Sequence, residues 1–285
     1  MKIIILILAL VLNCLAQNVS ELTAYNYHER VGIPRARSIK LSEATSPRIV
    51  GGAQAALGTF YYQAGLLISL TRGGQSICGG SLLSTTRVLT AAHCWWDGQN
   101  QGKAMTVVLG SLKVFSGGTR VLATSVVVHP TWNPQDITHD VAMVKFPAIT
   151  YTNNIKAIPL PSAAEAASDF AGLTGTASGY GKTKDGQSVT PSTATLYYKD
   201  LSIISNSVCQ KRFDFPLHGS HLCTDGAKGV GTCDGDSGGP LTVTRSASRV
   251  LVGVASFGLG SGCQRGDPSV YSRVTAFLPW IRANL

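Results

Sequence analysis

The sequence has little charge for its length, and beyond its first residues it lacks any long apolar run. Charged residues make up 14% of the 285 positions, and apolar residues make up 44%. A disordered chain would show the opposite balance, because it cannot bury enough apolar surface to fold. No stretch after residue 16 reaches the roughly 18 apolar residues that a membrane-spanning helix needs. The sequence therefore indicates one large folded domain or two packed halves, with no membrane partner.

Runs of basic residues are also lacking. The chain has 24 Lys and Arg against 15 Asp and Glu, for a net charge of +9, and residues 49–285 hold 18 basic and 12 acidic residues. These positions are dispersed, with no run of three or more Lys or Arg and no recognised nucleic-acid module. The positive balance is thus attributed to solubility and mild electrostatics, and no nucleic-acid partner is expected.

The first sixteen residues are typical of a secretory signal. Lys2 precedes an unbroken apolar run from Ile3 to Leu12, and the small residues Cys14 and Ala16 stand where a signal peptidase would need them. The run is too short for a transmembrane anchor. We therefore expect residues 1–16 to be removed and the protein to be exported.

Closely spaced cysteines are missing, which argues against zinc. Structural zinc sites generally use close pairs such as Cys-x-x-Cys. Without Cys14, an even number of cysteines remains in an oxidising compartment, so three disulfides are expected. Six cysteines allow 15 pairings, and spacing alone does not choose among them. The six are Cys78, Cys94, Cys209, Cys223, Cys233 and Cys263.

Residues 17–48 have no sustained period of 2 or 3.6. They are polar and are interrupted by Pro34 and Pro47, which is typical of a linker or prosegment. Asn18 begins an Asn-x-Ser acceptor pattern for glycosylation, a triplet that is common by chance. Whether Asn18 is glycosylated stays open.

After Arg48, short apolar runs alternate with turn residues, among 31 Gly and 12 Pro in the chain. This alternation indicates an all-β protein built as antiparallel barrels or sandwiches. The length of residues 49–285 allows two packed six-stranded antiparallel β-barrels. Residues 272–285 space their apolar positions as one helical face and predict a C-terminal α-helix. The predicted strands lie within 65–70, 87–92, 105–109, 121–128, 141–146, 196–204 and 250–256.

Three motifs carry candidate chemistry. His93 lies in the run Thr-Ala-Ala-His-Cys, which ends an apolar strand, Asp140 directly precedes another apolar strand, and Ser237 lies in Gly-Asp-Ser-Gly-Gly-Pro. A serine hydroxyl is a poor nucleophile unless a histidine accepts its proton and a carboxylate orients that histidine. Each motif alone has a structural explanation, but the order His, Asp, Ser is one of the known chain orders of this triad.

With these motifs, residues 48–285 resemble the chymotrypsin family of secreted serine endopeptidases. The matching stretches are RIVGG at 48–52, CGGSLL at 78–83, TAAHC at 90–94, GDSGGP at 235–240 and VTAFLPWI at 274–281. Others, such as VVLGS and SGCQRG, are most similar to insect digestive chymotrypsins. The resemblance implies a protease domain over residues 49–285 that acts on proteins or peptides and needs no cofactor.

The resemblance also assigns roles to the motif residues. It implies that Ser237 is the nucleophile, His93 the general base and acid, and Asp140 the group that orients His93. The amides of Gly235 and Ser237 would form the oxyanion hole. It further implies the disulfides Cys78–Cys94, Cys209–Cys223 and Cys233–Cys263.

Activation is implied by Arg48 and Ile49. Cleavage after Arg48 would free the Ile49 ammonium to pair with Asp236, so residues 17–48 would be the prosegment of a zymogen. Because the expected specificity is not for basic residues, a separate trypsin-like protease is the expected activator. Alternatively, Arg48 is an exposed linker residue.

The specificity pocket is predicted from alignment with the same family. Its base and walls would be Gly231, Gly258 and Ser269, and the segment from Ser256 through Phe257 would pair with substrate backbone. An uncharged pocket favours a large apolar or aromatic side chain, as in chymotrypsin, because burial of apolar surface contributes about 25 cal/mol per Å². Asp234 is expected at the rim, either as a solvated charge or as a negative group that tolerates basic side chains.

Several alternatives remain at this stage. The specificity is alternatively broad and collagenase-like, or trypsin-like, and a catalytically silent homologue that binds a partner would share the fold. The resemblance implies a secreted, extracellular monomer that meets protein protease inhibitors, and it alone suggests digestion and a gut lumen. No metal is expected: the loop between Asp97 and Asp136 contains no Asp or Glu, and calcium requires several oxygen ligands that usually include carboxylates.

Overall fold

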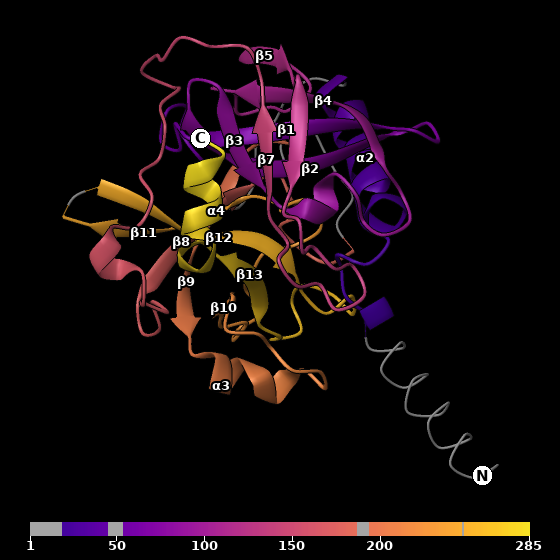
Figure 1. Cartoon of the computed structure of the whole chain (residues 1–285). Coiled ribbons are helices and arrows are strands. Elements are labelled where there is room, and N and C mark those ends of the chain that lie inside the picture. Colours follow the sequence, from indigo (N-terminus) through magenta and orange to yellow (C-terminus); the bar gives the residue numbers. More distant parts are fainter. Residues whose placement is uncertain (1–18, 45–53, 187–193, 247) are drawn as a thin grey trace.

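The computed structural model describes residues 19–44, 54–186, 194–246 and 248–285. Two antiparallel β-sheets pack against each other, with helix α2 beside the first sheet and helix α4 between the two (Figure 1). The expected signal peptide, Asn18, and the bond between Arg48 and Ile49 lie outside the described residues.

The first sheet closes into a barrel through its two edge strands, β5 and β6. Its strand order is β5-β4-β1-β2-β3-β7-β6. Strands β5 and β6 are consecutive halves of one bent strand, because Ala123 N donates to Met105 O at 2.9 Å and Thr124 N donates to Lys145 O at 2.8 Å. Residues 119–128 therefore pair with both β4 and β7 and close the sheet. The strands are β1 (Gln63–Leu70), β2 (Gln75–Ser84), β3 (Arg87–Thr90), β4 (Gly102–Leu109), β5 (Thr119–Leu122), β6 (Ser125–Val128) and β7 (Ala142–Lys145).

The second sheet is a closed six-stranded barrel in the order β10-β13-β12-β11-β8-β9. The prediction of two six-stranded antiparallel barrels is thus confirmed, once β5 and β6 are counted as one strand. Predicted strands match β1, β3, β4, β5, β6, β7, β9 and β12, whereas β2, β8, β10, β11 and β13 were not predicted. The strands are β8 (Thr174–Gly179), β9 (Tyr197–Ile204), β10 (His221–Thr224), β11 (Pro240–Arg245), β12 (Ser248–Phe257) and β13 (Ser269–Arg273).

The C-terminal helix α4 spans Val274–Ala283, as predicted from its apolar spacing. It buries Val274, Phe277, Leu278 and Ile281, which join the core of the first barrel and residues of β12. The helix therefore fastens the end of the chain across the junction of the two barrels. Three short helical turns, η2 (Ala92–Cys94), η3 (Ala163–Glu165) and η4 (Gln210–Arg212), and helix α3 (Asn206–Cys209) complete the domain.

Residues 19–44 are folded, although the sequence showed no sustained helical period there. A turn of π-helix, η1 (His28–Gly32), runs into α2 (Ile33–Ala44), which packs against β2 (Figure 1). Pro34 is the second residue of α2 and directly follows the π-helical turn. Few side chains of α2 are buried, so the apolar stripe was too narrow to detect.

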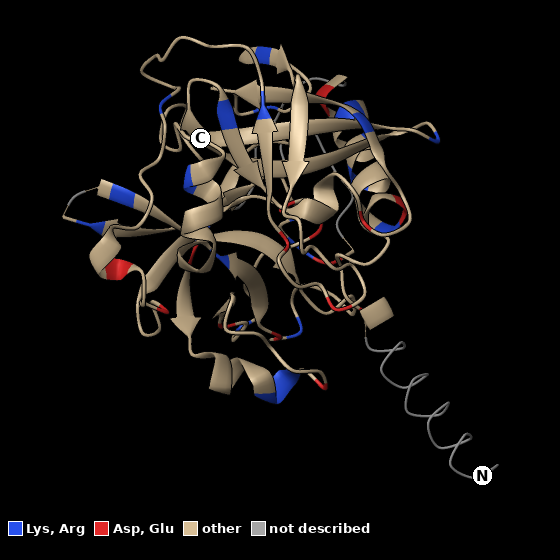
Figure 2. Ribbon diagram, viewed as in Figure 1, with Lys and Arg blue, Asp and Glu red and all other residues tan. Residues whose placement is uncertain are grey.

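Basic residues are spread over both barrels and α2 (Figure 2). Blue positions occur on β4, β5, β11, α2 and α4, with acidic positions between them. This distribution agrees with the absence of basic runs in the sequence.

Candidate active site

His93 and Asp140 meet at the inner edge of the first barrel. His93 lies in η2, directly after β3, and Asp140 lies two residues before β7, the strand that pairs with β3. His93 Nδ1 is 2.8 Å from Asp140 Oδ2, and the His93 backbone N–H donates to Asp140 Oδ1 at 2.9 Å. Both residues are buried. The two hydrogen bonds fix the imidazole ring and direct Nε2 away from the carboxylate.

The second barrel supplies further partners to Asp140. The Ser256 hydroxyl donates to Asp140 Oδ2 at 2.5 Å, and the Ser272 hydroxyl donates to the Asp140 carbonyl at 2.8 Å. Burial alone would raise the pKa of Asp140, but His93, Ser256 and the His93 N–H together hold that pKa below its ordinary value. The ionised carboxylate therefore stabilises the fold above its ordinary pKa, and this stabilisation is lost as the pH falls through the lowered pKa.

Ser237 lies in a tight loop that leads into β11. Gly235 has φ +102° and Gly238 has φ +78°, conformations that favour glycine. A Cβ on Gly238 would lie 2.2 Å from Thr90 Oγ1 and 2.6 Å from Gly79 O, so the loop approaches the first barrel too closely for any side chain there. The Ser237 carbonyl accepts from Gly79 N at 2.7 Å. Both barrels therefore hold the loop.

The amides of Gly235 and Ser237 donate to no backbone carbonyl among the described residues. Asp236, between them, is held by two backbone donors: Gly181 N at 2.8 Å and Cys233 N at 2.9 Å. Desolvation is the main cause that raises the pKa of the Asp236 carboxyl, against these hydrogen bonds and the attraction of Arg35. The loop thus presents free N–H groups next to a carboxylate that lacks a full counter-charge.

A tyrosine from the N-terminal segment lies beside both the histidine and the serine. The Tyr27 ring lies 4.8 Å from the His93 ring at an interplanar angle of 62°, and Tyr27 and Ser237 line the same pocket. Among the described residues, His93 and Ser237 share no hydrogen bond. Sequence analysis missed Tyr27, because nothing in its local pattern signals a contact 66 positions away.

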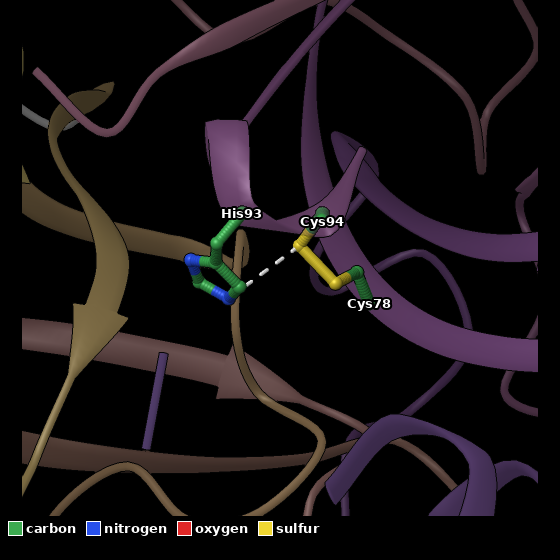
Figure 3. A group of neighbouring side chains, drawn as sticks. All are labelled: Cys78, His93 and Cys94. Carbon is green, nitrogen blue, oxygen red and sulfur yellow. Dashed lines mark hydrogen bonds between the residues drawn. A yellow bond between two sulfur atoms is a disulfide. The ribbon is translucent and has the colours of Figure 1, made fainter. Parts of the chain in front are cut away.

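Three disulfides form in the pairs that the resemblance implies: Cys78–Cys94, Cys209–Cys223 and Cys233–Cys263. In Figure 3 the Cys78–Cys94 bridge lies beside the His93 ring, with Cys94 Sγ 3.9 Å from His93 Nε2. Both groups of possible metal ligands among the described residues contain disulfide sulfurs. Such sulfurs are not thiolates, so these groups are poor metal sites.

A pocket opens beside Ser237, between the residues that follow β12 and the turn before β13. Its remaining space is about 40 Å³. The lining includes five of the residues predicted for substrate binding, namely Asp234, Ser256, Phe257, Gly258 and Ser269. Gly231 is absent from that lining and stands behind Ser269, where a Cβ would meet the Ser269 hydroxyl at 2.6 Å.

Two carboxylates line this pocket, and each has a basic partner. Asp234 pairs with Lys182 Nζ at 2.7 Å, in a half-buried contact. Asp267, which sequence analysis missed, pairs with Arg212. The rim charge expected at Asp234 is therefore neutralised by Lys182, which lines the adjoining cavity and carries no local sequence signal for this contact.

A second cavity, of about 400 Å³, adjoins the first. Asp236, Gly231 and Lys182 line it, together with the start of β9. The candidate activation residue Asp236 therefore faces a space large enough for several side chains.

Comparisons with known proteins agree with this geometry. A family model described as Trypsin matches residues 49–281. The chain belongs to the trypsin family. Among its relatives are a Collagenase of Hypoderma lineatum, 37% identical over 245 residues (85% of this chain and 89% of the relative), and Serine protease 1 of Drosophila melanogaster, 38% identical over 239 residues (83% and 85%).

A crab relative and a solved structure extend the comparison. Brachyurin of Leptuca pugilator is 35% identical over 238 residues, covering 82% of this chain and 97% of the relative. The solved structure of HL collagenase superposes with a TM-score of 0.75 at 36% identity and covers 83% of this chain and 98% of that chain. This trypsin-family chain is therefore a serine endopeptidase with insect relatives, which confirms the predicted family and the enzyme class.

Replacing Ser256 by Ala tests the hydrogen bond that the second barrel gives to Asp140. Hydrogen bonds to charged groups contribute about 1.5–3 kcal/mol, so we expect kcat of the activated enzyme to fall roughly tenfold or more. KM should change little, because the backbone of residue 256 is kept. Ser248→Ala, at the exposed start of the same strand, is the matched control. An unchanged kcat, or a change confined to KM, would contradict this role.

Proposed function

We propose that this trypsin-family endopeptidase hydrolyses peptide bonds through an acyl-enzyme at Ser237. The observation that carries the proposal is the buried chain of Ser256, Asp140 and His93, which ends beside the Ser237 loop. His93 Nε2 would accept the Ser237 proton as the oxygen attacks the carbonyl and would then deliver it to the leaving amine. Asp140, whose pKa is held low, would stabilise the imidazolium formed in between.

The oxyanion would be stabilised by the amides of Gly235 and Ser237. Preorganised donors of this kind are worth about 3–4 kcal/mol each when one is removed. The positive φ of Gly235 turns its peptide into the loop, and the Ser237 carbonyl is fixed by Gly79. These features support an oxyanion site that needs little reorganisation.

We further propose that the chain is exported as a zymogen, with residues 1–16 as signal and 17–48 as prosegment. None of the helices among the described residues is both long and apolar enough to cross a membrane. Cleavage after Arg48 would release an Ile49 ammonium that enters the cavity beside Asp236. The raised pKa of Asp236 supports this, because a buried carboxylate without a full counter-charge gains from a cation. A digestive role in a gut lumen, and protein inhibitors as partners, rest on the resemblance alone.

Covalent labelling of Ser237 tests both activity and activation. The purified zymogen, incubated alone, should not react with a fluorophosphonate, and treatment with trypsin should produce labelling together with a new Ile49 N-terminus. Asp236→Asn should be cut equally but stay unlabelled, because the new ammonium has no charged partner. Labelling that never appears in the cut chain would indicate the silent homologue instead. Rapid self-activation of the untreated zymogen would oppose the need for a separate trypsin-like activator.

The specificity that the pocket supports best is chymotrypsin-like, after large apolar or aromatic residues. Gly231, Gly258 and Ser269 contribute no charge, and the carboxylate of Asp234 is already paired with Lys182. A substrate ammonium entering this pocket would lose water without gaining a free carboxylate, at a cost of several kcal/mol. The similarity to proteins named Collagenase and Brachyurin supports a broader, collagenase-like specificity as the second candidate.

Paired p-nitroanilide peptides that differ only at the residue before the scissile bond test this specificity. We expect kcat/KM for Phe over Arg to exceed about 100, or about 2.7 kcal/mol. Lys182→Met should narrow the ratio, because it frees the Asp234 carboxylate for a basic substrate. Asp234→Gly should widen the ratio, because it leaves Lys182 as an unpaired cation near the rim. Equal rates on Phe and Arg peptides in the unmodified enzyme would overturn the apolar assignment and favour the broad alternative.

A further inference from the structure

Residues 19–44 occupy the catalytic cleft, and we infer that they are a peptide inhibitor of the mature protease, bound non-covalently once the chain is cut after Arg48. This inference rests on the proposed activation and deepens it. The segment buries Leu22, Tyr27 and Ile39 almost completely. It packs across β2 and reaches from Leu259, beside the pocket, to the loop after β4 at Val114. The described prosegment is thus an ordered part of the site.

The start of the segment hydrogen-bonds to the backbone beside the pocket. Leu22 forms an antiparallel bridge with Leu259. Thr23 N donates to Gly258 O at 3.0 Å, and Gly258 N donates to the Thr23 hydroxyl at 3.0 Å. Gly260 N also donates to Glu21 O at 2.7 Å. Peptides commonly bind by adding a strand to exposed backbone of this kind, so a substrate strand at residues 258–260 must first displace the prosegment.

The pairing stops before any peptide bond reaches Ser237 in extended form. Tyr25 N donates to Leu22 O at 3.2 Å, and Asn26 has φ +49°, so the chain turns away. Thr23, Tyr27 and Val31 then line the pocket entrance, but the pocket itself keeps about 40 Å³ of space. The segment therefore binds along the cleft without offering a bond in the geometry for cleavage, which suits an inhibitor better than a substrate.

Tyr27 acts on the catalytic residues directly. Its hydroxyl donates to Ile77 O at 2.7 Å, and its side chain lines the same pocket as Ser237. Burial is the main cause that raises the pKa of Tyr27 far above its ordinary value, so the phenol stays neutral. Tyr27 thus fills space beside Ser237, while its ring packs against the His93 ring.

The far end of the segment has its own anchors. The Glu43 carboxylate accepts from Val114 N at 3.0 Å, Phe115 N at 3.1 Å and the Ser116 hydroxyl at 2.8 Å. Arg35 is buried and donates through Nη2 to Tyr180 O at 2.6 Å. The positive charge of Arg35 also opposes the rise in the pKa of Asp236 that burial causes. Asp236 is the carboxylate that the Ile49 ammonium would neutralise.

The segment is also braced within itself. Arg30 Nη1 donates to the carbonyls of Ser20, Leu22 and Tyr25 at 2.6, 3.1 and 3.2 Å. Such bracing reduces the entropy lost on binding. Residues 17–48 contain no cysteine, so no disulfide would hold the segment after cleavage. Its contacts alone would then determine when the cleft opens.

His28 gives these contacts a pH dependence. It is buried, its Nδ1 lies 2.8 Å from the Ser76 hydroxyl, and its N–H donates to Asp97 at 2.8 Å. Desolvation is the main cause that lowers its pKa to about 4; His93 adds to this and Asp97 opposes it. Because the docked His28 binds a proton less readily than the free one, docking should weaken as the pH falls from about 6.5 toward 4.

Gel filtration of the cut chain carrying Ser237→Ala measures this effect without proteolysis. An enteropeptidase site in place of residues 44–48 restricts cleavage to the bond before Ile49. At pH 7 the prosegment should co-elute with the domain, and at pH 5 it should separate more readily. His28→Gln should reduce this difference, because no imidazole remains to titrate. Equal retention at both pH values would contradict the dependence on His28.

The decisive experiment compares the activity of variants of the cleavable chain that keep Ser237, after cutting. The unmodified cut chain should show low activity on a Phe peptide at high protein concentration, and its specific activity should rise on dilution. Tyr27→Ala should bind the prosegment about tenfold more weakly or worse, since it loses the ring contact and the hydrogen bond. Its activity should then be nearly independent of dilution. Arg37→Ala, an exposed position on α2, should behave like the unmodified chain.

Two outcomes separate this inference from the proposed function. Full activity in the unmodified cut chain at every dilution, or identical behaviour of Tyr27→Ala, would overturn the inhibitor. If no cut chain is active, the proposed function fails, and the Ser237→Ala chains then decide the inhibitor by retention alone. If the prosegment no longer co-elutes with the domain in Tyr27→Ala but still does so in Arg37→Ala, the inhibitor inference is supported. Equal retention of the prosegment in both variants would overturn that inference.

Discussion

The buried carboxylate of Asp140 is the constraint on which the site depends. An ion taken out of water needs partners on every oxygen, or the cost is several kcal/mol. Asp140 receives them from two directions, from His93 in the first barrel and from Ser256 in the second. The barrels must therefore dock in one register for the carboxylate to stay ionised. Packing of the two halves and orientation of the histidine are thus a single requirement.

The Ser237 loop meets the same requirement from the other side. Its carbonyl accepts from Gly79 in β2, and a side chain on Gly238 would collide with Thr90 and Gly79. The close approach needs glycine on both faces of the junction, which explains why the motifs around residues 79 and 238 are rich in it. The N-terminal segment packs against this junction, since the Tyr27 hydroxyl donates to Ile77 O, two residues before Gly79.

Much of this architecture follows from local sequence. Alternating apolar runs predicted most strands of the first barrel, and the terminal helix followed from its period, because each signal is contained in one segment. His93, Asp140 and Ser237 could be named because each lies in its own motif. Lys182, Asp267 and Tyr27 could not, because their roles come from contacts across loops with no local pattern. The helix α2 was missed for a related reason: its stability comes from β2 and from Glu43, whereas its own apolar stripe is narrow.

The closure of both barrels has a consequence for how this protein meets other chains. Within a closed barrel each strand finds both neighbours, so no row of unpaired N–H and C=O groups is left for a foreign strand. The backbone at residues 258–260, where β12 has left the barrel, is different: there the pairing partner comes from outside the sheet. This backbone, next to Ser237, is where the domain pairs with a segment from outside its barrels. The closed barrels thus protect the protein from sheet-to-sheet aggregation and still leave this short stretch able to pair with an extended segment.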